Sequence, residues 1–500
     1  MVFQPLARPC RTLHFRLRIR CLIFRLLATT CLLLFSFITG PAQDLSARIS
    51  IISLNYPARV KVEGAYAKGS DRWFFRNTYG PLIGIGDRIQ GLQLNDVNGA
   101  SMSVHKVGPG EFTGDRSATD FNYEVNLAPP LNVADAAHIS SLDNQRGYQM
   151  LADLLPDFPA SAMRVEFVLP QSWRIVSSAV RSSQGWYDLR DKANAVFFVG
   201  PDLKLKHKKI GGADLTFVAA GEWTFSADAV IKNAARIFDD YKRHTGFQPK
   251  EPVTLMLAPF SASGAKSWSA ETRGSNLVLL ANNSPSAKYS LGQLSVVLCH
   301  ELFHAWVPNA LSLDGNYDWF FEGFTLYQAL CAAVRLGLID FQEYLDTLGR
   351  VYDSYLLARE SGDLSLLEAS RRRWTSGSSL VYDQGMLVGF LYDLKLRKAG
   401  RNSHGLDVVY QELFRRFPAG GKLIDGNEAL IPILIEQDGD EQFVRRYIQT
   451  PGAIDLEITL RDYGIRVINS GNKKRLQIAD PLNSGQQEVL KGLRYRKRKQ

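Results

Sequence analysis

Two histidines and a glutamate in the segment Val296–Trp306 have the spacing of a metal-binding helix. Positions four apart on an α-helix lie one above the other, so His300 and His304 present both imidazoles to one point, with Glu301 beside them. A catalytic zinc ion takes three protein ligands and keeps a fourth position for water, so the pair needs one more donor. Glu322 follows in an apolar, aromatic helical segment, where a lone carboxylate is costly to bury unless it is paired or bound to a metal. We therefore expect one zinc ion held by His300, His304 and Glu322.

The residues around this motif favour a metal site over a chance pattern. Three fixed positions within five residues occur by chance in many chains. Here an apolar stripe at helical spacing leads into the motif, formed by Leu291, Leu294, Val297 and Leu298. The histidines thus fall in a mostly buried helix, where unpaired polar side chains are disfavoured. Two histidines and two glutamates in such surroundings need a common partner, which zinc would supply.

Two further polar residues are candidates for the same chemistry. A predicted strand, Leu277–Leu280, precedes the metal-binding helix and is well placed to be a sheet edge on which an extended peptide lies. Glu271 stands just before that strand and is either a residue of the cleft or a solvated turn acid. Tyr382 begins an apolar helix and is either a core residue or a phenol that donates a hydrogen bond to an oxyanion.

The elements around these residues predict an α+β protein. Short alternating runs separated by Gly and Pro predict an all-β domain over 44–219. From residue 220 the pattern changes to a helix with Ser226 as its N-cap, a strand and the metal-binding helix, which predicts a catalytic domain over 220–400. We expect a helical C-terminal region over 401–470 and a solvated basic tail over 471–500.

The charge distribution argues against a nucleic-acid-binding protein. The formal net charge of the 500 residues is +9. Residues 1–43 carry +6 and residues 471–500 carry +7, so the body between them is at −4. A mildly acidic body lacks the basic surface that phosphate backbones require. The basic ends leave open an association with an anionic membrane surface.

The N-terminal 43 residues predict export. Six arginines precede an apolar run from Leu26 to Ile38. The small residues that follow, in 40–42, are suited to cleavage by a signal peptidase. We expect a periplasmic, secreted or membrane-anchored protein, the alternative to a cleaved leader being an uncleaved anchor. Outside the leader only Cys299 and Cys331 remain, too few for a disulfide framework. We expect packed free thiols, with a mutual disulfide as the alternative.

Together these segments resemble the glycyl aminopeptidase family of gluzincin metallopeptidases. The resemblance lies in His300–Trp306, Trp319–Thr325, Leu366–Ser370 and Tyr382–Gly385, with a looser similarity at Asp87–Gly91. It implies an N-terminal β domain, a thermolysin-like catalytic domain and a helical C-terminal region. It also implies that Tyr382 steadies the tetrahedral intermediate and that Glu271 binds the free amine of a peptide substrate.

The sequence departs from the family pattern near the predicted edge strand. The usual Gly-rich, Glu-His approach is replaced by Ser269–Arg273, and the usual Lys after the catalytic Tyr and its neighbouring acid is Gln384. These changes leave the preferred substrate residue open. The resemblance therefore implies an aminopeptidase that removes small N-terminal residues, with an endopeptidase of the same fold, or a non-catalytic binding protein that keeps the fold, as alternatives.

The expected mechanism follows from the chemistry of the motif. Zinc would polarise the scissile carbonyl and lower the pKa of its bound water toward neutrality. Glu301 would act as the general base, taking the proton from water and passing it to the leaving amine.

Overall fold

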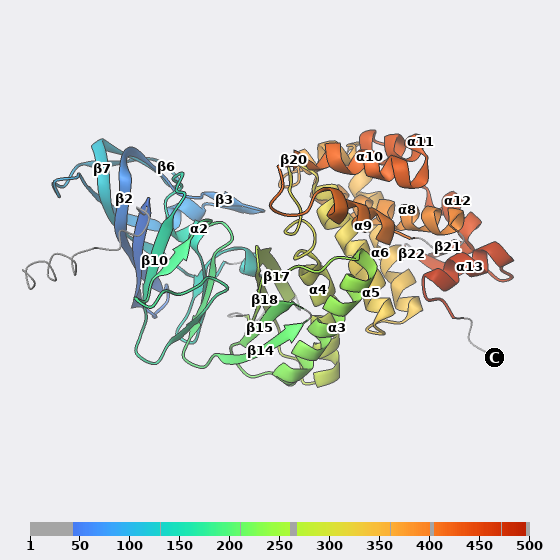
Figure 1. Ribbon diagram of the computed structural model, residues 1–500, viewed down its shortest axis with the longest axis horizontal. Helices are drawn as coiled ribbons and strands as arrows, with labels where there is room; N and C mark the ends of the chain where they lie inside the picture. Colours follow the sequence, from blue (N-terminus) through green and yellow to red (C-terminus); the bar gives the residue numbers. More distant parts are fainter. Residues whose placement is uncertain are drawn as a thin grey trace, which may run out of the picture.

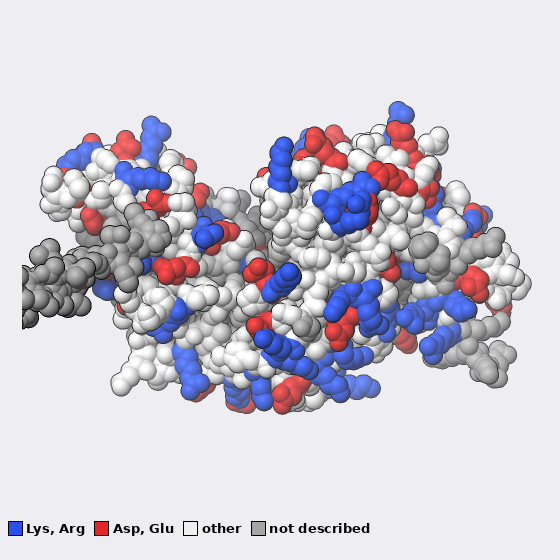
Figure 2. Space-filling view, viewed as in Figure 1, with Lys and Arg blue, Asp and Glu red and all other residues white. Residues whose placement is uncertain are grey.

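The computed structural model describes residues 44–130, 132–210, 212–260, 268–360, 362–400, 405–471 and 473–496. The predicted leader over residues 1–43 lies outside these ranges. The chain forms a β-rich lobe and a larger, mainly helical lobe side by side (Figure 1). Within the described ranges, no helix is long and apolar enough to cross a membrane. Acidic and basic side chains are interspersed over the face drawn in Figure 2, where a notch separates the two lobes at the top.

The β-rich lobe is built on a seven-stranded sheet of order β12-β10-β1-β2-β7-β5, with β6 paired to β7. Buried and more exposed residues alternate along β1, where Leu45, Ala47 and Ile49 are buried, because only one face of the sheet packs on the core. The strands are Leu45–Ser53 (β1), Arg59–Phe74 (β2), Ile89–Asn95 (β5), Val104–Gly108 (β6), Glu111–Asn126 (β7), Met163–Val168 (β10) and Tyr187–Leu189 (β12).

A four-stranded sheet of order β11-β13-β9-β8 joins this lobe to the rest of the molecule. Its central strand β13 is buried throughout because both of its faces are covered. Phe197 and Val199 pack into the β-rich lobe, whereas Val196 and Phe198 pack against a separate five-stranded sheet. The strands are Ser141–Leu142 (β8), Gly147–Met150 (β9), Arg174–Val176 (β11) and Val196–Gly200 (β13). Short elements complete the lobe: Thr78–Tyr79 (β3), Leu82–Ile83 (β4), Ile85–Arg88 (η1), Val133–His138 (η2) and Leu151–Leu154 (α2).

The five-stranded sheet belongs to the region that we expected to be catalytic, and its strand order is β14-β15-β16-β18-β17. Along β16, Leu255 and Leu257 face the helices while Met256 and Ala258 face the four-stranded sheet, so this sheet is buried on both sides. The strand Leu277–Leu280, which we expected at the sheet edge, lies within β18 and is paired on both sides, by β16 and β17. The edge among the described residues is instead β17, the strand that contains Glu271, because it runs antiparallel along the outer side of β18. The strands are Lys204–Ile210 (β14), Ala213–Ala219 (β15), Val253–Pro259 (β16), Trp268–Arg273 (β17) and Asn276–Ala281 (β18).

Helices cover the sheet and carry the metal-binding motif. Helix α3 begins as predicted, because the Ser226 side chain accepts a hydrogen bond from the Ala229 N–H at 3.2 Å. Two π-helical turns, η3 and η4, interrupt the helices that follow α4. The elements are Ala227–Thr245 (α3), Ala287–Phe303 (α4), Trp319–Phe324 (η3), Thr325–Arg335 (α5), Phe341–Glu360 (α6), Leu366–Arg371 (α7), Leu380–Gln384 (η4) and Gly385–Ala399 (α8).

Cys299 and Cys331 are both free thiols, so the alternative of a mutual disulfide is wrong.

The C-terminal part of the chain is helical, as we expected. The segment over 471–500, however, is not the solvated tail that we predicted. Residues after 471 form strand β22 and helix α13, and Leu476, Val489 and Leu490 are buried. The Lys474 N–H also donates to Asp353 of α6 at 2.9 Å, so this segment packs on the helical lobe. The elements are Leu313–Asp314 (β19), Asp407–Arg416 (α9), Ile424–Asp425 (β20), Gly426–Asp438 (α10), Glu441–Val444 (α11), Arg445–Gln449 (η5), Leu456–Thr459 (α12), Leu460–Tyr463 (η6), Ile465–Ser470 (β21), Lys473–Ile478 (β22) and Ser484–Gly492 (α13).

The predicted fold class is confirmed. A β-rich N-terminal region, a mixed catalytic region and a helical C-terminal part follow one another along the chain. The exact domain boundaries given above remain predictions.

Candidate active site

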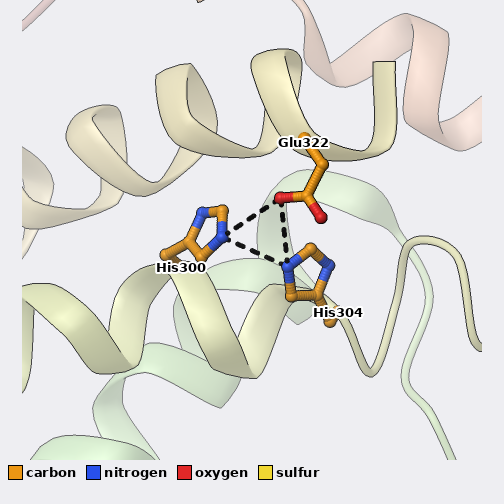
Figure 3. A group of neighbouring side chains, drawn as sticks. All are labelled: His300, His304 and Glu322. Carbon is orange, nitrogen blue, oxygen red and sulfur yellow. Dashed lines mark hydrogen bonds and ion pairs between the residues drawn. The ribbon is translucent and has the colours of Figure 1, made fainter. Parts of the chain in front are cut away.

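The three predicted zinc ligands meet at one point between α4 and η3 (Figure 3). The Nε2 atoms of His300 and His304 are 3.2 Å apart, and they lie 3.5 and 3.8 Å from Oε2 of Glu322. Ligand atoms about 2.0–2.2 Å from a tetrahedral zinc ion lie roughly 3.3–3.6 Å from one another. The three atoms are therefore spaced as one zinc ion requires.

Hydrogen bonding prepares His304 to bind a metal. Its Nδ1 lies 3.0 Å from the carbonyl oxygen of Val307, which can only accept a hydrogen bond. Nδ1 must therefore carry the proton, which leaves the Nε2 lone pair for a metal ion. The Nδ1 atom of His300 is buried and has no hydrogen-bond partner among the described residues. The Nε2 atom of His300 is the one that faces the other two ligands (Figure 3).

Arg373 orients the carboxylate of Glu322. Its Nη2 donates to Oε1 of Glu322 at 2.7 Å, while Nη1 donates to Oδ1 of Asp318 at 2.8 Å. Burial opposes the charged form of Glu322, but Arg373 and the two histidines outweigh burial and lower its pKa to about 2. Glu322 thus stays ionised in an apolar surrounding, with Oε1 held by Arg373 and Oε2 turned toward the histidines.

Glu301 lies beside the metal-binding group without belonging to it. Its side chain is buried, and Oε2 accepts a hydrogen bond from the Thr272 hydroxyl of β17 at 2.7 Å. The edge strand therefore fixes the rotamer of Glu301. A carboxylate held in this way beside a metal site can accept a proton from a water molecule.

Tyr382 comes from the second π-helical turn, η4, and lines the same cavity. Its hydroxyl accepts a hydrogen bond from Nη2 of Arg373 at 2.6 Å. Burial raises the pKa of Tyr382 well above its usual value, although the Arg373 charge opposes that rise. The phenol is therefore protonated at neutral pH and can donate a hydrogen bond to developing negative charge.

Glu271 is buried and contacts residues of the β-rich lobe, so it is not a solvated turn acid. Its Oε2 lies 2.5 Å from Nδ1 of His138, and its Oε1 accepts from the Tyr79 hydroxyl and lies 3.4 Å from Nε of Arg273. Burial alone would raise the pKa of Glu271, but His138, Arg273 and Tyr79 together lower it. Glu271 is therefore an ionised carboxylate at the contact between the two lobes.

One cavity of about 680 Å³ connects all of these groups. Both lobes contribute to its wall. It is lined by Tyr79, Pro81, Asp135, His138, Ala270, Glu271, Thr272, His300, Glu301, His304, Pro308, Asn309, Phe321, Glu322, Arg373, Trp374, Thr375, Ser378 and Tyr382. The structure thus brings together all six residues that the sequence singled out.

Comparison with known proteins agrees with this arrangement. Residues 293–388, which include the three ligand residues, Glu301 and Tyr382, match the family described as M61 glycyl aminopeptidase. The match identifies the chain as a zinc metallopeptidase. The resemblance that the sequence predicted is therefore confirmed. No curated protein matches the chain at a significant level.

Solved structures share the fold of this metallopeptidase. An aminopeptidase N family protein from Idiomarina loihiensis has a TM-score of 0.71 at 17% identity, covering 85% of this chain and 79% of that chain. An M1 zinc metallopeptidase from Deinococcus radiodurans has a TM-score of 0.50 at 18% identity, covering 83% and 96%. A mutant of that M1 protein bound to a Tyr-Ser-Ala substrate has a TM-score of 0.50 at 17% identity, covering 83% and 94%. At sequence identities this low, the similarity shows a shared fold.

Sequence reasoning missed the residues of the metallopeptidase that orient the predicted ones. His138 has no other histidine or cysteine at metal-ligand spacing, so nothing in the sequence singles it out, yet it contacts Glu271 from 133 positions away. Tyr79 and Asp135 also reach the cavity from the β-rich lobe and carry no motif. Arg373 had only a weak signal in the sequence, as the last of three consecutive arginines. The structure shows that it is the least exposed of the three.

Proposed function

We propose that this zinc metallopeptidase is an exported aminopeptidase that removes small N-terminal residues from peptides with the help of one zinc ion. The observation that carries the proposal is the position of Glu271 in the cavity that also holds the zinc ligands. An aminopeptidase needs a fixed anion to hold the ammonium of its substrate one residue from the metal. Glu271 is an ionised, oriented carboxylate that suits this role.

The chain's own residues divide the reaction between them. When bound by His300, His304 and Glu322, zinc supplies Lewis-acid polarisation of the scissile carbonyl and of a water molecule. Glu301 accepts the proton of that water at a carboxylate oxygen and returns it to the leaving amine. Thr272 holds Glu301 in place for both transfers.

Tyr382 and Arg373 act on the negative charge that develops at the carbonyl oxygen. The Tyr382 hydroxyl accepts from Arg373, so its own proton remains available for a hydrogen bond to the oxyanion. The fixed guanidinium adds a positive charge behind the phenol, and because both groups are oriented before substrate binds, little reorganisation is needed during the reaction.

The β-rich lobe favours an exopeptidase over an endopeptidase. An endopeptidase needs a cleft that accepts peptide on both sides of the metal. Here Tyr79 and His138 both contact Glu271, so elements of the second lobe lie where peptide preceding the first residue would pass. The Deinococcus M1 mutant was solved with a Tyr-Ser-Ala substrate, and we propose that this chain also acts on peptides.

Export is proposed from the sequence of residues 1–43, with its arginines, apolar run and small residues. Fractionation of cells that express the full chain tests this proposal. Mature protein in the periplasm, medium or membrane fraction with the leader removed or retained would support export, and protein confined to the cytosol would contradict it.

Peptide cleavage tests the proposed activity. Purified zinc-loaded protein should release alanine or glycine from Ala-Ala-Phe-amide and Gly-Ala-Phe-amide, and a chelator should abolish this release. N-terminal acetylation of the same peptides should stop cleavage, because it removes the charge that Glu271 binds. Efficient cleavage of acetylated peptides at internal bonds would instead make the protein an endopeptidase.

A further inference from the structure

We infer that Trp374 and the β3–β4 hairpin form the wall of the subsite for the first substrate residue and restrict that residue to small side chains. The inference rests on the proposed aminopeptidase function and deepens it. Tyr79 and Pro81 of the hairpin and Trp374 of the α7–η4 loop all line the cavity that contains Glu271. β3 reaches from the β-rich lobe toward the helical lobe (Figure 1). The wall is therefore made by two lobes.

Tyr79 is a rigid part of this wall. Its hydroxyl donates to Glu271, and the guanidinium carbon of Arg273 lies 3.8 Å from the centre of its ring. The guanidinium carbon of Arg76 lies 5.0 Å from the same ring. Cation–π contacts and a charge-assisted hydrogen bond thus fix the ring, so it cannot move aside for a large substrate side chain at little cost.

The hairpin that carries Tyr79 is also fixed. β3 and β4 are joined by the two residues Gly80 and Pro81, and Gly80 has a φ of +57°. A glycine with positive φ followed by proline suits a type II′ turn, whose twist matches the two strands. A Cβ on Gly80 would lie 3.2 Å from the indole of Trp374, so the turn packs directly on that ring.

Trp374 closes the wall from the catalytic side. Its ring centre lies 6.0 Å from that of Tyr79, and the guanidinium carbon of Arg373 lies 4.1 Å from the indole. About half of the side chain, 52%, remains exposed although it is a large aromatic residue. An exposed indole held between a fixed hairpin and a fixed arginine is suited to contact a ligand.

The position of Glu271 connects this wall to the first substrate residue. Glu271 binds Tyr79, so an ammonium held by Glu271 places the first side chain next to the aromatic wall. Rings that are held in place in this way would favour glycine and alanine over leucine at that position. One methylene more or less in an apolar pocket changes the discrimination between substrates by roughly 10–200-fold.

The test compares leucyl and alanyl p-nitroanilides with zinc-loaded wild-type protein and two variants. Trp374→Ala should raise the ratio of kcat/KM for the leucyl over the alanyl substrate by about 10-fold or more, and Trp374→Phe should raise it less. Trp186→Ala is the matched control, because Trp186 is also a partly exposed tryptophan stacked on an arginine, Arg164, but lies in the β-rich lobe outside the cavity. It should leave the ratio unchanged.

The outcomes separate the wall from the proposed function. A wild-type protein that is active on the alanyl substrate, with a ratio that Trp374→Ala leaves unchanged, would overturn the wall and keep the aminopeptidase. A wild-type protein that cleaves no free-amine substrate would overturn both. Thermal melting of each variant checks folding. If Trp374→Ala melts early, Trp374→Phe takes its place in the comparison. A kcat/KM ratio in Trp374→Phe equal to that of the wild type would then overturn the wall.

Discussion

Gly323 and Gly385 lie backbone against backbone, so that a Cβ added to Gly323 would be 2.5 Å from the Cα of Gly385 and 2.6 Å from the carbonyl oxygen of Val381. Each glycine belongs to or follows a π-helical turn that carries a site residue, Glu322 in η3 and Tyr382 in η4. Contact between the two turns therefore sets the distance between the Glu322 carboxylate and the Tyr382 phenol. π-Helical turns are uncommon and are frequent at functional sites.

Gly323→Ala should weaken zinc binding as well as stability. The added methyl group must push the two turns apart, because the atoms that it meets are backbone atoms. Overpacking of this kind costs about 1–3 kcal/mol of unfolding free energy. Glu322 is the neighbouring residue, so we also expect faster loss of zinc to a chelator. Denaturant unfolding and a zinc-release assay measure the two effects.

Gly292→Ala is the matched control for this prediction. Gly292 lies in α4, the helix that carries the two histidines, and a Cβ there would meet nothing within 4 Å. Replacing a glycine in a helix by alanine should raise the unfolding free energy by about 0.5–1 kcal/mol. Equal destabilisation by both variants would contradict the role given to the contact between Gly323 and Gly385.

Glu301→Gln should separate catalysis from metal binding. The amide cannot accept and return the proton of water, so kcat should fall by about 10²–10⁴-fold. Zinc content should remain that of the wild type, because Glu301 is not among the three residues that meet at the metal site. His304→Ala serves as the contrast and should lose both zinc and activity. Full activity in Glu301→Gln would end the proposed mechanism.

Arg373→Met should lower kcat and stability together. It would leave the carboxylates of Asp318 and Glu322 without the cation that pairs with both. Removing one partner of such a buried ion pair costs about 3–5 kcal/mol. The Tyr382 hydroxyl would also lose its donor, so turnover should fall while KM changes little, because Arg373 acts on the reacting groups through Glu322 and Tyr382.

Arg373→Lys distinguishes charge from geometry in this arrangement. Lysine keeps the positive charge but has no planar fork that reaches two carboxylates and a phenol at once. We expect partial recovery of the melting temperature and little recovery of kcat. If Arg373→Lys has wild-type turnover, the guanidinium does not position Tyr382.

His138→Gln should destabilise the protein more at acidic than at alkaline pH. Burial alone would lower the pKa of His138, but the hydrogen bond and charge of Glu271, with Asp135 and Glu301 contributing, outweigh burial and raise it. A group with a raised pKa stabilises the fold fully below its unfolded value, about 6.5, and this contribution disappears as the pH rises through the folded value. The difference in Tm between wild type and variant should therefore shrink as the pH rises above neutrality.

His105→Gln is the control for this pH dependence. His105 also lies near an acid, with its Nε2 3.5 Å from Asp115, but its side chain is 70% exposed. An ion pair in water contributes little to stability, so this variant should melt like the wild type across the range. A pH-independent effect of His138→Gln would show that the pair with Glu271 is not charged in the folded protein.

The cluster of His300, His304 and Glu322 is the part of this protein that the sequence determined most fully. His300, Glu301 and His304 are placed by the period of one helix, and Glu322 by the helical segment that follows, so local spacing was enough to name them. Local pattern likewise predicted the N-cap Ser226 and the strand Leu277–Leu280, but it placed this strand at the sheet edge, where β17 lies instead. These are properties of neighbouring residues along the chain.

Tertiary structure decided how those residues are held and what surrounds them. Glu271 is bound by Tyr79 and His138, which lie 192 and 133 positions away in the other lobe, and no periodicity in the sequence links them. The segment after residue 471 was expected to be solvated because it is strongly basic, yet apolar side chains that include Leu476, Val489, Leu490 and Leu493 pack it on the helical lobe. Burial of a side chain depends on which distant surface covers it, and that is fixed only when the two lobes and their helices pack together.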